Sequence, residues 1–176
     1  MKYASHLHKL HHSLGTTCLI AMFFGAMPAH ATVLSSPISV GVVTPLSLTK
    51  VQDLEFGGFS ASATSGRIFI NAYTDGRSST GGVTLLGGTT SAAKFLSYGY
   101  RGQTISILRP STAITLTRIG GGATMTMDQF TLNGGALRSV KTDGVVDVRV
   151  GCRLNIAANQ MGGSYAGSFT LTVEYQ

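Results

Sequence analysis

The fold class is decided by the stretch Gly163-Ser164-Tyr165-Ala166-Gly167-Ser168-Phe169-Thr170-Leu171-Thr172-Val173-Glu174-Tyr175. Its odd positions from 165 to 175 carry tyrosine, glycine, phenylalanine, leucine, valine and tyrosine, and small or polar residues stand between them. Successive side chains of a β-strand point to opposite sides, so a period of two is typical of a strand with one buried face. We therefore expect one long strand whose inward face includes Phe169, Leu171, Val173 and Tyr175.

Shorter alternating runs recur upstream of this stretch, and turn signals separate them. The apolar members of these runs are Ile38, Val40 and Val42; Leu46 and Leu48; Ile68 and Ile70; Val83 and Leu85; Ile105 and Ile107; Ile114 and Leu116; Met125 and Met127; Val146 and Val148; Leu154 and Ile156. The turn signals are Gly57-Gly58, Asp75-Gly76, Gly81-Gly82, Gly87-Gly88, Gly120-Gly121-Gly122, Asn133-Gly134 and Asp143-Gly144, while 60–65 and 78–80 have loop composition. Many short strands with tight turns predict one all-β domain, a sandwich or a barrel.

The N-terminus has the three parts of a secretory signal. Lys2 and Lys9 give a basic start, 18–27 form an apolar run, and Ala29-His30-Ala31 is a small-x-small site. Ten apolar residues span about 15 Å as a helix, half of the ~30 Å needed to cross a bilayer. We predict cleavage after Ala31 and export to the periplasm, cell surface or medium, with no stable membrane span. Residues 32–44 then form an N-terminal extension or first strand, and 45–176 form the β-domain.

The residue types behind most catalytic and metal sites are missing after the signal. All five histidines lie within the first 30 residues, which excludes a Ser-His-Asp triad and the commonest zinc ligand from the rest. Asp53 and Glu55 would share a strand face, but a solvated strand end explains them more simply than a glycosidase-like pair. We expect a protein that is not an enzyme and has no catalytic, metal or cofactor-binding residues.

Charge and cysteine usage narrow the partners. The chain carries a formal charge of +6, but the basic residues outside the signal are scattered and not interleaved with aromatic residues. A nucleic-acid surface normally clusters its cations, so we expect a solvated surface and no nucleic acid. Cys152 is the one cysteine left after cleavage, and it is either buried as a small apolar group or available for an intermolecular bridge.

Several motifs in order give the chain a family resemblance. They are 45–50 followed by Leu54-Glu55-Phe56-Gly57, then Gly81-Gly82-Val83, the run around Phe95, Val150-Gly151 before Leu154, and 163–175. Over nearly all of 38–176 the chain resembles DUF4402, a family of bacterial exported domains. That resemblance implies a single immunoglobulin-like antiparallel β-sandwich with no assigned enzymatic activity. More loosely, the chain is similar to spore-coat-U-type and archaic chaperone–usher pilins.

The pilin likeness rests on two positions and implies a mode of assembly. Such pilins end in an alternating strand with a penultimate tyrosine and a glycine fourteen residues from the end, which match Tyr175 and Gly163 here. The likeness implies that a neighbouring subunit adds its N-terminal strand to an incomplete sandwich. Under this hypothesis Ile38, Val40 and Val42 are the donor side chains, and Phe169, Leu171, Val173 and Tyr175 line the acceptor groove. The likeness further implies self-polymerisation with a periplasmic chaperone and an outer-membrane usher.

Two other interpretations remain open at this stage. In a self-complete sandwich the first and last strands pair within one chain, which would produce the same two alternations. Such a domain would be an adhesin or a carbohydrate-binding module, with Tyr73, Tyr98 and Tyr100 stacking on sugars beside Arg77 and Arg101. The leading hypothesis is a non-enzymatic, exported, cell-surface or fimbria-like structural subunit.

Overall fold

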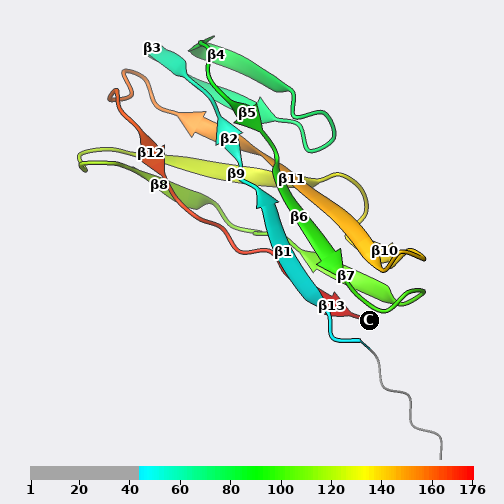
Figure 1. The fold of residues 1–176 in the computed structure, drawn as a ribbon. Helices are drawn as coiled ribbons and strands as arrows, with labels where there is room; N and C mark the ends of the chain where they lie inside the picture. Colours follow the sequence, from blue (N-terminus) through cyan, green and yellow to red (C-terminus); the bar gives the residue numbers. More distant parts are fainter. Residues whose placement is uncertain (1–43) are drawn as a thin grey trace, which may run out of the picture. The chain divides into compact units, whose positions relative to one another are not determined.

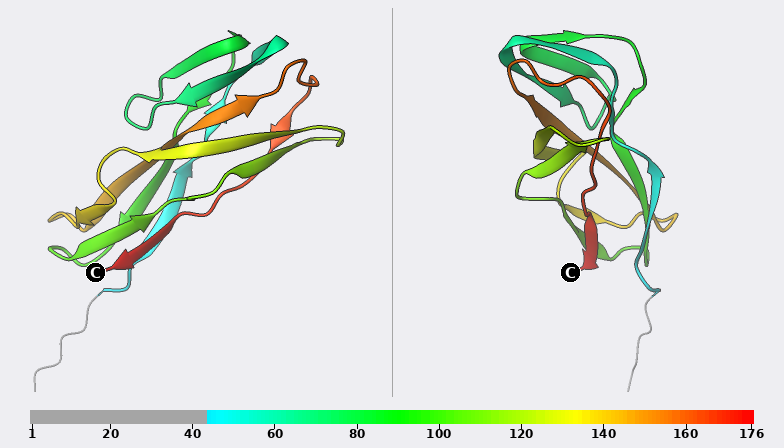
Figure 2. Two further views of the ribbon diagram at one scale, coloured as in Figure 1. Left: turned by 180° about the vertical axis from the view of Figure 1, so that it is seen from behind. Right: turned by 90° about the vertical axis from the view of Figure 1, so that its left-hand side faces the viewer.

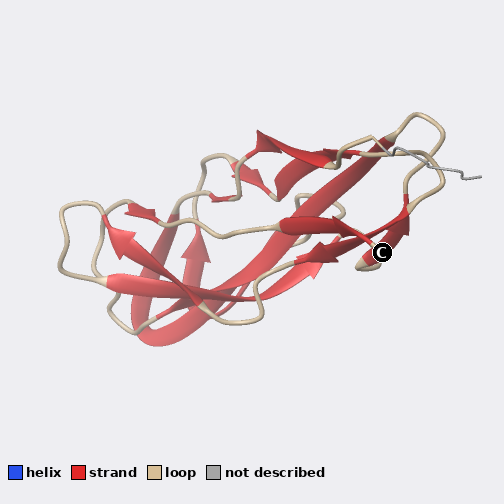
Figure 3. Cartoon of the chain, turned by 90° about the horizontal axis from the view of Figure 1, so that it is seen from below, coloured by secondary structure: helices blue, strands red, loops and turns tan. Residues whose placement is uncertain are grey.

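Strands and turns make up residues 44–176, the part of the chain that a computed structural model describes (Figure 1). Every strand pair in this part is antiparallel. Figure 3 shows strands and loops throughout the described part and no helix. The expected all-β antiparallel class is confirmed. Within residues 44–176 there is also no helix long and apolar enough to cross a bilayer.

The largest sheet has eight strands. Its main path runs in the order β1 (Ser47–Gln52), β6 (Ala93–Tyr98), β11 (Val145–Ile156), β9 (Thr124–Leu132), β8 (Ile114–Arg118) and β12 (Tyr165–Ala166). A long hairpin of β3 (Phe59–Ile70) and β4 (Arg77–Leu85) joins this sheet through the pairing of β3 with β11. The central strand β11 therefore has neighbours along both of its sides.

A second sheet has three strands, β10 (Leu137–Ser139), β7 (Thr104–Leu108) and β13 (Thr172–Tyr175), and a short pair joins β2 (Glu55–Phe56) to β5 (Thr90–Ser91). The hydrophobic core combines side chains from the eight-stranded and the three-stranded sheet. Ile68, Val148 and Leu154 come from the former and Ile105 and Ile107 from the latter, and all are buried. A core shared by two sheets is what a β-sandwich requires.

The final alternating stretch is not the single strand that the sequence predicts. It is split into β12, which pairs with β8, and β13, which pairs with β7 in the other sheet, so residues 167–171 cross from one sheet to the other. Figure 2 shows this crossing as the red trace between the two short arrows. Gly167 allows the start of this crossing to lie close to β8, because a Cβ there would lie 3.0 Å from the Thr115 carbonyl oxygen. The prediction was wrong because an alternating pattern gives the buried face of a strand and not its partner.

A second expectation was also wrong: residues 60–65 and 78–80 are not loops, and Gly81-Gly82 is not a turn between strands. These residues lie inside β3 and β4, where the register shifts between Ala61 and Gly66. The glycines allow the two strands to approach closely, since a Cβ on Gly66 would lie 2.6 Å from the Thr80 carbonyl oxygen. Small polar side chains thus form an exposed hairpin in place of flexible loops.

The other turn signals with positive φ are correct. Asp75 begins its Asp-Gly pair at φ 57° between β3 and β4, and Gly144 has φ 76° before β11. The three glycines at 120–122 all have positive φ and connect β8 with β9.

Candidate assembly edge

Strand β1 is an edge of the eight-stranded sheet. It pairs with β6 on one side, and no other strand of residues 44–176 pairs with it. Leu46 and Leu48 point toward the core but are only half-buried. Lys50 is the cross-strand partner of Phe95, so it lies on the same core-facing side, and its Nζ binds Asp53 Oδ1 at 2.6 Å. A lysine on an edge strand, here 58% exposed, is a common guard against unwanted strand pairing.

The stretch from 165 to 175, here named the C-terminal segment, is a second edge. Tyr165 and Ala166 pair with β8, and 172–175 pair with β7. Along its other side, the described part of the chain supplies no strand. Backbone N–H and C=O groups on an unpaired side are a template for a further strand. β1 and the C-terminal segment are therefore both sheet edges with core-facing apolar side chains.

The predicted acceptor side chains lie on one face of the C-terminal segment. Leu171 is buried, while Phe169, Val173 and Tyr175 are half-buried and packed against the core. The Phe169 ring lies 6.2 Å from Phe95, edge to face, and 5.5 Å from Phe130. Because Phe95 belongs to the strand next to β1, this ring reaches from the C-terminal segment toward the β1 side of the core.

Tyr175 connects the start of the described chain with the C-terminal segment. Its hydroxyl donates a hydrogen bond to the Thr44 carbonyl oxygen at 2.9 Å and accepts one from the Tyr100 N–H at 2.7 Å. The phenol thereby joins Thr44, the first described residue, to the end of the C-terminal segment. The sequence singles out this tyrosine by its position, but its hydroxyl contacts could not be predicted.

Gly163 lies just before the C-terminal segment, at the other end from Tyr175. It has φ 140°, and a Cβ there would lie 2.6 Å from Arg118 Nε. The Arg118 guanidinium donates to the carbonyl oxygens of Gly162, at 2.8 Å, and Gly121, at 3.1 Å. Gly163 therefore provides room for this arginine and does not contribute a side chain to the predicted groove. The predicted donor residues Ile38, Val40 and Val42 lie outside the described residues.

The outer face of the eight-stranded sheet carries ion pairs. Arg153 binds Asp128 through two hydrogen bonds of 2.7 Å, and both side chains are mostly covered. The hydrogen bonds from Arg153 hold the pKa of the Asp128 carboxyl below its usual range, against the opposing effect of burial. Arg149 binds Asp75 at 2.9 Å on the same sheet. Pairing within the molecule thus neutralises part of the scattered basic charge.

Cys152 occupies the centre of this sheet and is 2% exposed. Burial, with a smaller effect from the Asp128 charge, raises the pKa of its thiol to about 12. A thiol that is buried and protonated near neutral pH is unreactive, because the thiolate is the nucleophile. The burial alternative is confirmed.

The residues of the rival sugar-binding hypothesis do not form one site. Tyr98 and Tyr100 are exposed at the end of β6 and in the turn after it, whereas Tyr73 lies in the β3–β4 turn. Arg77 is used internally: its guanidinium donates to the carbonyl oxygens of Phe56, at 2.6 Å, Gly58, at 3.0 Å, and Leu86. Arg77 therefore holds loops together and offers few donors to a ligand.

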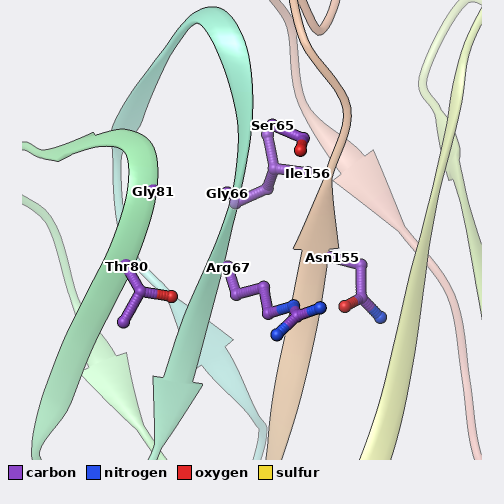
Figure 4. A pocket seen from close by; sticks show the side chains of 7 residues that line it. All are labelled: Ser65, Gly66, Arg67, Thr80, Gly81, Asn155 and Ile156. Atoms are coloured by element: carbon purple, nitrogen blue, oxygen red, sulfur yellow. The ribbon is translucent and has the colours of Figure 1, made fainter.

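A polar hollow of about 410 Å³ lies where β3, β4 and β11 meet, lined by Ser65, Gly66, Arg67, Thr80, Gly81, Asn155 and Ile156 (Figure 4). Arg67 and Asn155 are cross-strand partners and lie on the same side of the sheet. The hollow is wide open and its donors are exposed, so it does not isolate a ligand from water. Within residues 44–176 no three histidine, cysteine, aspartate or glutamate side chains gather to hold a metal ion.

Sequence reasoning missed the structural arginines. Arg77, Arg118 and Arg138 each donate to backbone carbonyls of glycine-containing loops, and Arg138 additionally binds Asn133 Oδ1 at 3.0 Å. One sequence signal is that a glycine pair lies near each arginine in the sequence, because glycine-rich loops leave backbone carbonyls open to a guanidinium. The pattern is too general to have identified these contacts in advance.

Comparison with known proteins gives one match. Residues 46–175 match the family model described as "Domain of unknown function (DUF4402)". No curated protein and no solved structure shows significant similarity to the chain. The matched range covers the described domain from just before β1 to the end of β13.

Proposed function

We propose that this chain, which belongs to the DUF4402 family, is an exported, non-enzymatic structural subunit that assembles by β-strand complementation. In this proposal residues 32–43 of one copy form a strand that enters a second copy between β1 and the C-terminal segment. Ile38, Val40 and Val42 supply its inward side chains. The assembled protein forms a fimbria-like polymer at the cell surface.

The observation that supports this proposal most strongly is the pair of unpaired edges with half-buried apolar side chains. β1 presents Leu46 and Leu48, and the C-terminal segment presents Phe169, Val173 and Tyr175. An added strand would satisfy backbone groups on these edges and cover their apolar side chains, which is how strand addition gains affinity. Strand β11, which has strand neighbours on both sides and whose core side chains are all buried, shows the burial that the edges lack.

The length and composition of the donor fit the edge. The C-terminal segment has eleven residues, so it extends over roughly 35 Å at about 3.3 Å per residue. Residues 32–43 number twelve and carry no charged side chain. An uncharged strand of matching length can lie beside the whole edge without burying a charge.

An unpaired apolar edge is hazardous before assembly, because it templates aggregation. The proposal therefore includes a periplasmic chaperone that covers the edge and an outer-membrane usher that orders the exchange. Export depends on the predicted signal at 1–31.

The test is electrophoresis in SDS of the cell-surface fraction, unheated and boiled, with detection of this protein. Strand-exchanged polymers give a ladder that collapses to the monomer only on boiling. Val40→Asp abolishes the ladder, because the donor strand would bury a charge. Ser39→Asp is the matched control: it places the same charge on the outward face of the same strand, and the ladder persists.

Two results would contradict the proposal. One is a single unheated monomer band from cells shown to export the protein, which supports the self-complete sandwich and directs attention to the exposed tyrosines as ligand contacts. The other is a ladder that thiol reductant removes without boiling, which indicates bridging through Cys152 instead of strand exchange.

A further inference from the structure

Exposed apolar side chains gather at the two opposite ends of the C-terminal segment. At one end is the glycine-rich tip, defined as residues 118–122 with 161–164, where Ile119 is 68% and Met161 50% exposed. At the other is the tyrosine end, defined as Thr44, Tyr98, Tyr100 and Tyr175, where Tyr98 and Tyr100 are 42% and 43% exposed. Figures 1 and 2 show the β8–β9 turn and the C-terminus at opposite ends of the domain.

Each patch is built onto the C-terminal segment by hydrogen bonds. At the glycine-rich tip, the Tyr165 hydroxyl of the C-terminal segment donates to the Met161 carbonyl oxygen at 2.6 Å, and Met161 lies against Gly122. At the tyrosine end, the Tyr175 hydroxyl binds both the Thr44 carbonyl and the Tyr100 N–H. The eleven-residue segment between the patches spans up to about 35 Å, at roughly 3.3 Å per residue.

The strand topology fixes the direction of the edges. Each neighbouring pair on the path from β1 to β12 is antiparallel, so β1 and the C-terminal segment run in opposite directions. The chain enters β1 beside Tyr175, because Thr44 is hydrogen-bonded to it. The described part of each copy thus begins at its tyrosine end, and the proposed donor strand, residues 32–43, directly precedes this point in the sequence.

A donor strand from a second copy has two possible directions. If it ran parallel to the C-terminal segment, the donor's residue 44 would arrive at Tyr175, where the recipient's own Thr44 is already bound. If it ran antiparallel, the donor's residue 44 would arrive at the glycine-rich tip, which leaves Tyr175 to the recipient. Only the antiparallel direction separates the place where the donor's residue 44 arrives from the place where the recipient's own chain begins at Thr44. A head-to-tail polymer requires this separation.

The antiparallel direction brings the two apolar patches together. The donor's domain begins at Thr44, so its tyrosine end is the part that reaches the recipient's glycine-rich tip. Resting on the proposed strand exchange, we infer that Ile119 and Met161 of each copy pack against Tyr98 and Tyr100 of the next copy along the polymer. Aliphatic and thioether groups pack favourably on aromatic rings, and both patches would leave water.

A double variant, Ile119→Cys with Tyr100→Cys, tests this contact in the full-length exported protein. Within one chain the two positions are too far apart for a disulfide, which needs Cα atoms within about 7 Å. Oxidised polymers should therefore give a covalent ladder that survives boiling and disappears with thiol reductant. The control pair is Ile119→Cys with Tyr73→Cys, whose second position is more exposed than Tyr100, at 64% against 43%, but lies in the β3–β4 turn, and it should give no covalent ladder.

The outcomes separate this inference from the proposed function. An unheated ladder without a covalent ladder overturns the end-to-end contact and leaves strand exchange standing. The absence of any unheated ladder overturns both. A covalent ladder that persists after adding Val40→Asp overturns the inference, because the contact would then form without the donor strand.

Discussion

The two sides of this domain differ in how completely their strands are paired. On the β11 side, the central strand has neighbours along both edges, and Val148, Val150 and Leu154 are at most 2% exposed. On the β1 side, one edge strand and the C-terminal segment leave Leu48 and Val173 half-buried. The same residue types thus contribute different amounts to the stability of the lone domain. Under the proposed strand exchange, burial of the remaining apolar surface on the open side would add stability to the assembled protein.

The largest expected effect is a cavity on the closed side. Leu154→Ala should lower the free energy of unfolding by about 2–5 kcal/mol, because it leaves a cavity in a packed core. Leu48→Ala should cost about 1 kcal/mol, because half of that side chain already contacts water. Urea unfolding of both variants in the monomeric Val40→Asp background measures the difference, and equal costs would contradict the contrast between the two sides.

The next effect is stabilisation of the open side by a peptide. A synthetic peptide of residues 36–44, added to the monomeric Val40→Asp chain, should raise the free energy of unfolding. The gain is about 2.7 kcal/mol at a concentration one hundred times the dissociation constant. Thermal unfolding with increasing peptide measures it. The same peptide carrying the Val40→Asp substitution is the control, and an equal gain from both would show that the alternating side chains do not determine binding.

A smaller effect distinguishes the two ends of the C-terminal segment. Tyr175→Phe should cost about 1 kcal/mol, because it removes the hydroxyl that binds Thr44 and Tyr100. Tyr165→Phe is the matched change, since its hydroxyl binds the Met161 carbonyl and Gln160. Amide hydrogen exchange at Tyr100 should accelerate in Tyr175→Phe alone. Faster exchange in both variants would mean that the ends are not independent.

The smallest effect concerns acid stability. Arg153 lowers the pKa of Asp128 in the folded protein, so the pair stabilises the fold above the ordinary carboxyl pKa of about 3.9. This contribution is lost as the pH falls through the lowered value. Asp128→Asn should therefore be less stable at neutral pH and lose less stability on acidification. Asp53→Asn, which breaks an exposed pair on the open side, should follow the parent, as urea midpoints measured from pH 6 to pH 2 would show.

The alternating pattern predicts most strands, because burial of one face imposes a period of two on the residues themselves. Leu154 and Ile156, or Met125 and Met127, are buried as that rule requires. The alternating pattern does not encode which neighbouring strand each strand pairs with. The division of 165–175 between two sheets depends on contacts with β7 and β8, and Gly167 is its one local sign.

For the proposed acceptor residues, the sequence could predict only that they share one face. Phe169, Leu171, Val173 and Tyr175 point to one side as expected, yet the sequence alone could not show that this edge lacks a second neighbour within residues 44–176. The internal hydrogen bonds of Arg77 were unpredictable for a related reason. An arginine near tyrosines suggests a ligand site, but here nearby loop carbonyls compete for the guanidinium.

The hydrogen bond between Tyr100 and Tyr175 has a consequence for the rate of folding. The two residues are 75 positions apart in the chain, and β7 and β13 pair across a similar separation. Closing so long a loop costs entropy before the strand contacts form, so folding through non-local strand pairs is slow, typically milliseconds to seconds. Until β13 docks, β7 keeps an open side that can capture the same strand of another molecule. Refolding yield should consequently fall as protein concentration rises, even for variants that have lost the donor strand.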